Sequence, residues 1–252
     1  MVNYILADYK RVISRIPRIA VLIIFQIICV FSVMRKFSSA AGNFNSVNLI
    51  DTLSPFYGNL FLVTVCIVDF IQSFSYDFSA KTIQVAIGLG ISRLKVIIAK
   101  LVQVTLVILT DMLVTLAVFG VLSAALGIPL ALHQIGDVFI KFICTVLLAS
   151  CSICLVLPLV FRTQSMITSL IAYIVIFLGT ITQLLRWASR SGPVILARLQ
   201  LDRFTHDSCI GSILGNALMG DFKLLPYLGV IFYFALGIWL TWLCFRKMEL
   251  DF

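Results

Sequence analysis

The chain has 252 residues, of which 61% are hydrophobic and 12% are charged, and its mean hydropathy is +1.11. Such a chain has too few polar residues to cover the surface of a water-soluble globule, so a soluble domain is excluded and a lipid bilayer is the expected environment. The formal net charge of +8 indicates no nucleic-acid partner, because basic residues beside a membrane also bind anionic lipid.

Six apolar stretches are long enough to cross a bilayer, which takes about 20 residues of helix. We therefore expect an all-α, polytopic membrane protein with a single transmembrane domain over residues 1–252. An amphipathic segment at 1–16 precedes the first span. Ser54 and Pro55 predict the start of the second, as its N-cap and its first helical residue. The predicted transmembrane helices cover residues 17–34, 54–74, 96–122, 137–161, 166–185 and 224–245.

The segments between the spans differ in length and character. Residues 77–93 repeat apolar side chains at helical spacing, which predicts an amphipathic helix between the second and third spans. The connection at 162–165 is so short that the fifth span must return beside the fourth.

The connection at 186–222 is long for a membrane bundle, and its pattern predicts two short amphipathic helices, at 194–204 and 208–219. Gly211 and Gly215 in the second of these are four residues apart, a spacing typical of closely packed helices. A loop without helices is the alternative for this connection.

Basic residues near the helix ends set the expected orientation. More of them flank the ends that lie on the N-terminal side, among them Arg18 at the start of the first span and Arg246 at the end of the last. An even number of spans places both termini on one side, so we predict that both termini are cytoplasmic.

The order of these segments resembles that of the type-2 permeases of ABC transporters, specifically the small six-helix half that carries no ATPase of its own. The resemblance depends on the basic segment YILADYKRVISRI at 4–16, the amphipathic helix after the second span, the short 162–165 turn, the long outer connection and the charged tail FRKMELDF at 245–252. Five residues follow the family's usual cadence: Asp77, Thr82, Ser92, Arg93 and Lys100. Lys81 departs from it, since the family often has Gly there.

The resemblance implies an elbow helix at 1–16, a coupling helix at 77–93 that docks on an ATPase, and re-entrant outer helices within 186–222. It also implies partners: two copies of an ABC ATPase subunit that bind ATP and Mg²⁺, and a second permease copy or a related permease chain. The plasma membrane of a bacterium is the implied location. The residues expected to couple to the ATPase are Asp77, Lys81, Thr82, Gln84, Val85, Gly88, Ser92 and Arg93.

Motifs for chemistry on this chain are missing from the sequence. GLGIS at 88–92 has glycines but lacks the Lys and Ser/Thr of a phosphate-binding loop, and neither a metalloprotease nor a serine-hydrolase motif is present. Cys151 and Cys154 have a metal-like spacing, but inside an apolar run small cysteines are better explained by packing. We expect no enzyme activity, no bound cofactor and no metal site on this chain.

Three polar residues fall inside the predicted spans: Asp69, Gln103 and Asp111. A charge near the bilayer centre costs about 2.5–3.5 kcal/mol on insertion scales, so Asp111 should face the bundle interior. A proton or ion relay would want a second acid at similar depth, and the sequence indicates none, which favours a structural role. Asp69, near the inner end of its span, is expected to reach interfacial water or a basic partner.

Aromatic residues of the second and fifth spans are the predicted translocation path, because the resembling family lines its junction with these two helices. The residues are Phe56, Tyr57, Phe61, Phe70, Phe74, Tyr173 and Phe177. Apolar rings without a charge cluster suit an amphipathic cargo better than an inorganic ion, although core packing would explain them equally well.

The expected function is therefore export of amphipathic or hydrophobic peptides, such as bacteriocins, lantibiotics or cytolytic toxins, driven by ATP on a partner chain. Two alternatives remain. One is an ATP-independent channel or secondary carrier with Asp111 as its coupling site, and the other is a structural membrane scaffold.

Overall fold

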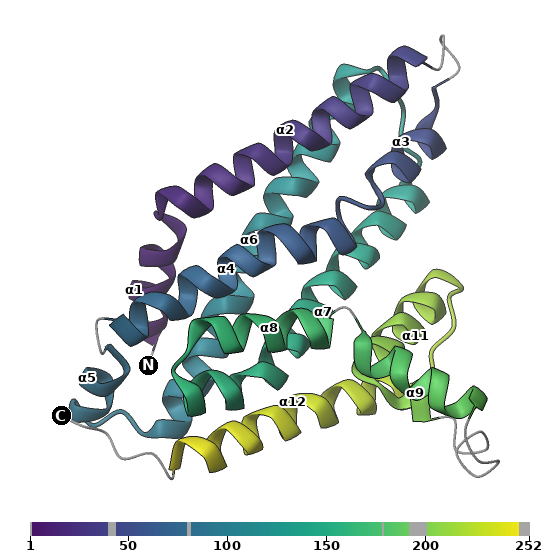
Figure 1. The fold of residues 1–252 in the computed structure, drawn as a ribbon. Coiled ribbons are helices and arrows are strands. Elements are labelled where there is room, and N and C mark those ends of the chain that lie inside the picture. Colours follow the sequence, from purple (N-terminus) through teal and green to yellow (C-terminus); the bar gives the residue numbers. More distant parts are fainter. Residues whose placement is uncertain (1, 40–43, 80–81, 178, 192–200, 247–252) are drawn as a thin grey trace.

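The computed structural model describes residues 2–39, 44–79, 82–177, 179–191 and 201–246, and all regular structure in them is helical (Figure 1). Four helices are long and apolar enough to cross a membrane: α2 (Ile16–Ser39), α6 (Arg93–Ala125), α7 (Leu132–Thr163) and α12 (Leu224–Arg246). They correspond to the first, third, fourth and sixth predicted spans. The chain is thus an all-α, membrane-embedded protein.

The second predicted span begins later than expected. Helix α3 (Ser46–Leu53) comes first, with the Asn45 side chain accepting a hydrogen bond from the backbone N–H of Asn48 as its N-cap. Ser54 belongs to the end of α3, because its N–H donates to Ile50 O, and the chain then turns before α4 (Asn59–Ser79). The predicted start at Ser54 and Pro55 is therefore wrong, and the apolar part of α4, Asn59–Phe74, is too short to count as a candidate span.

The fifth predicted span is broken in two. Helix α8 (Met166–Phe177) has 12 residues, or about 18 Å of helix, well below the ~30 Å of a bilayer core. Gly179 then adopts a φ of +62°, a left-handed conformation that ends a helix, and α9 (Thr180–Ser191) leaves in another direction (Figure 1). The prediction of one helix over 166–185 is wrong because it missed this glycine.

One of the two short helices predicted between residues 186 and 222 is present in the structure. Helix α11 (His206–Leu218) matches the expected second short helix, whereas the first lies largely outside the described residues, with only the short 3₁₀ helix η1 (Leu201–Phe204) at its end. Helix α9 lies beside η1 and α11 (Figure 1). Within the described residues nothing lies within 4 Å of a Cβ built on Gly211 or Gly215, so no described helix of this chain packs closely on these two glycines.

Helix α7 is the centre of the bundle and contacts α6, α8, α11 and α12. A close approach occurs at Gly237 of α12, where an added Cβ would lie 2.7 Å from both the carbonyl oxygen and the Sγ of Cys154. The glycine, together with the small cysteine side chain, lets these two helices pack closely.

The predicted amphipathic helix at 77–93 is shorter in the structure. Helix α4 continues to Ser79, α5 covers only Thr82–Gly88, and α6 begins at Arg93. Gly90, with a φ of +87°, ends the helical path after α5. The segment expected to be an elbow forms a separate N-terminal helix, α1 (Val2–Ile13), and α1, α5 and the C-terminal end of α12 lie at the same end of the bundle (Figure 1).

Candidate functional site

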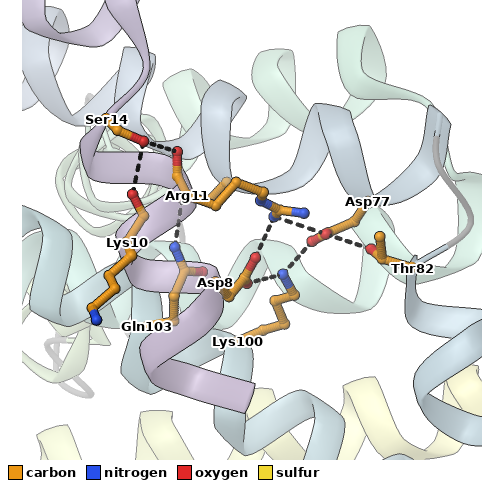
Figure 2. A network of polar contacts seen from close by, with 9 residues as sticks. Asp8, Lys10, Arg11, Ser14, Asp77, Thr82, Lys100 and Gln103 are labelled. Atoms are coloured by element: carbon orange, nitrogen blue, oxygen red, sulfur yellow. Dashed lines mark hydrogen bonds and ion pairs between the residues drawn. The ribbon is translucent and has the colours of Figure 1, made fainter. Parts of the chain in front are cut away.

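A network of ion pairs joins α1, α4 and α6 beside α5; we call Asp8, Arg11, Asp77 and Lys100 the ion network. Lys100 of α6 pairs with Asp8 of α1 and with Asp77 near the end of α4. Arg11 pairs with Asp8 and, at 3.0 Å, with Asp77. Figure 2 shows how the four side chains converge from the three helices.

Three members of the ion network are buried, Arg11 is partly exposed, and the charges of the four balance. Lys100 is 0% and Asp77 1% exposed, and two acids face two bases. Burying charges is costly unless each is paired, so this pairing holds the three helices in one arrangement. Burial, with the nearby Asp77 and Asp8 carboxylates, also raises the pKa of Tyr4, which keeps the phenol next to the network neutral.

Helix α5 is attached directly to this network. The Thr82 hydroxyl, at the first residue of α5, donates a 2.7 Å hydrogen bond to Asp77 Oδ1 (Figure 2). On the inward side of α5, Ile83 and Ala86 are buried in the core. The outward side presents Val85, 59% exposed, and the turn after it presents Leu89, 79% exposed.

Arg93 attaches the start of α6 to the end of α12. Its Nη1 donates to the carbonyl oxygen of Arg246 at 2.9 Å and to that of Phe245, and its guanidinium lies 5.4 Å from the centre of the Phe245 ring. Ser92 is the backbone N-cap of α6 without a side-chain hydrogen bond. Both termini of the described chain are therefore tied to the segment that carries α5.

The eight predicted coupling residues thus fall into different environments. Asp77, Thr82 and Arg93 form contacts within the chain, and Asp77 offers no surface to a partner. Gln84 is half-buried, while Val85, Gly88 and Ser92 are exposed, and Lys81 lies outside the described residues. Leu89 was not among the predicted residues, because its exposure becomes visible only in the structure.

A second charged cluster lies further along α6; we call Arg18, Asp69 and Asp111 the triad. Arg18 Nε donates to Asp69 Oδ1 at 2.9 Å, and Nη2 donates to Asp111 Oδ1. A third donor, Nη1, lies 3.3 Å from the carbonyl oxygen of Ile13. All three side chains are buried, so α2, α4 and α6 are joined through one guanidinium.

The triad bears on three expectations. Arg18, expected as a basic flank of the first span, is the buried partner of two acids. Asp69 reaches a basic partner, as one alternative held, and not interfacial water. Asp111 does have a second acid beside it, because α4 brings Asp69 to the same guanidinium.

Gln103 lies on α6 between the two clusters. It is buried, and its Nε2 donates to Ser73 Oγ at 3.4 Å. Lys100 and Asp111 are 11 residues apart, which places them on nearly the same face of α6 and about 16 Å apart along it. One face of α6 therefore carries both charged clusters.

The aromatic residues predicted to line a path lie in the core of the single chain. Phe25 contacts Phe56 and Phe61 edge-on, Tyr57 packs on Phe142, and Phe70 stacks on Tyr173 at 5.3 Å. Phe56, Tyr57, Phe61, Phe70, Phe74 and Tyr173 are all buried. This is the core-packing alternative; the side chain of Phe177 lies outside the described residues, and a role in a path stays a prediction.

Hydrogen bonds at the far end hold α9 against α11. Asp207 accepts from the hydroxyls of Thr182 at 2.6 Å and Thr205 at 2.8 Å and from the backbone N–H of Ser208. Burial alone would raise the pKa of Asp207, but these hydrogen bonds and the neighbouring His206 hold it below its ordinary value. Burial lowers the pKa of His206, whose Nε2 lies 3.3 Å from Ser152 Oγ on α7.

Within the described residues no group of three His, Cys, Asp or Glu side chains is placed to hold a metal ion. Cys151 and Cys154 are buried free thiols on α7. Comparison of the sequence with family models, with curated proteins and with solved structures found no match.

Proposed function

We propose that the chain is the transmembrane permease subunit of an ATP-driven ABC exporter, as the resemblance of its segment order implies. Its cargo would be an amphipathic or hydrophobic peptide of the bacteriocin, lantibiotic or cytolytic-toxin kind. Two copies of a separate ATPase subunit would bind ATP and Mg²⁺, and a second permease copy or a related chain would complete the path. Both termini would face the cytoplasm of a bacterial cell.

One observation supports the proposal. Helix α5 and the turn after it present exposed apolar side chains, while the first residue of α5 is hydrogen-bonded to the ion network. Val85 and Leu89 are available for a partner, and the Thr82–Asp77 hydrogen bond connects the same segment to three buried helices. An exposed apolar patch beside a rigid support suits docking of another protein. Lipid is the other surface that could cover these two residues.

Force applied to α5 would reach several helices at once. Asp77 is part of α4, Lys100 of α6 and Arg11 of α1, and Arg93 connects the same region to α12. Because each link is a short polar contact or a covalent connection, α5 would act as a lever on the bundle. This is the mechanical property that a coupling helix needs.

The proposal includes six spans, with α4 and the α8–α9 region completing the four long helices. Helix α4 has 21 residues, or about 32 Å of helix, which matches the thickness of a bilayer core. Helix α8 would enter the membrane from the α7 side, and the break at Gly179 would let α9 and α11 fold back as re-entrant helices of the outer leaflet.

ATP hydrolysis by the complex purified from native membranes tests the proposal. Val85→Asp and Leu89→Asp should abolish peptide-stimulated hydrolysis without lowering the melting temperature, since both side chains are exposed. Leu132→Asp is the matched control, because Leu132 is 86% exposed and follows the opposite end of α6. Unchanged hydrolysis in both α5 variants would refute the role of α5. Charge reversal at Asp77 would not be informative, because Asp77 is buried.

An ATP-independent carrier remains the second candidate, and the triad favours it, since Asp69 supplies the second acid beside Asp111 that an ion relay wants. Transport by the purified chain in vesicles, driven by a proton or sodium gradient with no ATPase present, would establish it. Transport that requires ATP and a second chain would exclude it.

A further inference from the structure

The triad contains one positive and two negative groups in the interior of the bundle. Asp69 and Asp111 are 0% and 1% exposed, and Arg18 contacts both. Within the described residues the charged groups that act on these two carboxyls are each other and Arg18. With both acids ionised, the triad would carry a net charge of −1 away from water.

The ion network on the same face of α6 provides an internal comparison. There Asp8 and Asp77 face Arg11 and Lys100, so the charges sum to zero. An uncompensated charge in an apolar bundle is costly, and the chain avoids that cost in the ion network by adding a second base. The triad has no second base among the described residues, so something other than a basic side chain must neutralise its charge of −1.

The oxygen atoms of the two acids show where a positive charge that neutralises the triad would bind. Each acid uses Oδ1 to accept from Arg18, and both Oδ2 atoms are buried without a hydrogen-bond partner. Both of these Oδ2 atoms belong to carboxyls that bind the same guanidinium. Two carboxylates repel, whereas a carboxylate and a carboxylic acid can share a proton between such oxygens.

We infer that Asp69 and Asp111 together hold one proton at neutral pH, so that the triad is a proton-binding site with no net charge. A metal cation fits less well, because it needs several oxygen ligands and the triad offers two Oδ2 atoms that make no hydrogen bond. Cys66 of α4 and Tyr173 of α8 are also buried, and a thiol and a phenol supply no positive charge. This inference does not depend on the proposed export function.

Infrared spectroscopy of the full chain in lipid vesicles at pH 7 tests the inference. The wild type should show the carbonyl band of a protonated carboxyl group. Asp69→Asn and Asp111→Asn should each lose it, because a single remaining acid ionises opposite Arg18. Asp221→Asn, at an exposed acid, is the control and should keep the band.

Two results would overturn the inference. One is a wild-type spectrum without the band. If replacing choline by Na⁺ in the buffer also raises the melting temperature, a bound cation neutralises the triad. The other is a band that persists in both single variants, which would place the proton elsewhere. Should either Asn variant fail to fold, a titration of the wild type decides: a band lost reversibly at alkaline pH supports the site, and its absence at every pH contradicts it.

Discussion

Lys100 and Asp77 form an ion pair in the interior of the protein, although one belongs to the start of α6 and the other to the end of α4. The pair lies at the point from which α5 departs, and Asp8 and Arg11 of α1 complete it. Ion pairs inside the bundle therefore hold the segment between α4 and α6 in place.

Removing the base from the ion network should destabilise the fold. Lys100→Met keeps the length of the side chain but leaves Asp8 and Asp77 with only Arg11, and breaking a buried pair costs about 3–5 kcal/mol. Lys95→Met, on the same helix at an exposed position, should change stability by less than about 0.5 kcal/mol. Thermal unfolding in detergent compares the two, and equal midpoints would show that the network contributes nothing.

Gly237→Ala should disrupt the packing of α12 on α7. The new methyl group would lie 2.7 Å from Cys154 O, and overpacking of this kind costs about 1–3 kcal/mol. Gly211→Ala meets open space and should instead stabilise α11 by up to about 1 kcal/mol through helix propensity. The same unfolding assay checks both variants; a destabilising Gly211→Ala would mean that another chain packs on that face of α11.

The break between α8 and α9 depends on Gly179. An alanine there would be forced into a left-handed conformation, at about 1–2 kcal/mol, and its Cβ would also lie 2.9 Å from Asp207 Oδ2. Gly127 has a similar backbone conformation, with a φ of +65°, but no atom close to the position of an added Cβ, so Gly127→Ala is the matched control. We expect a larger fall in melting temperature for Gly179→Ala. Equal falls would show that the Asp207 contact does not matter.

The sequence was sufficient for the apolar helices and insufficient for the contacts between distant residues. Mean hydropathy located α2, α6, α7 and α12, because a span needs only local composition. Capping at Ser54 and continuity through Gly179 were predicted incorrectly, since several turn conformations suit the same residues. The ion network and the triad join residues up to 93 positions apart, a pairing that no local pattern contains.

Acid should weaken the packing of α11 through His206. Its pKa is lowered in the folded state by burial, so the unfolded ring, with a pKa of about 6.5, binds a proton that the folded ring resists. Stability should therefore fall as the pH drops from about 7 to 5. His206→Gln should reduce this slope, whereas His133→Gln, at an exposed position, should leave it unchanged. The measurement is the unfolding midpoint against pH, and identical slopes for wild type and His206→Gln would contradict the prediction.

Site-specific photo-cross-linking from residue 85 in native membranes tests the central claim most directly. With a photoreactive residue in place of Val85, we predict a covalent adduct with a nucleotide-binding ATPase, identified by mass spectrometry, and no such adduct from position 132 at the start of α7, beyond the other end of α6. An adduct with lipid alone at position 85 would contradict the account, because α5 would then rest on the membrane and could receive no force from a partner.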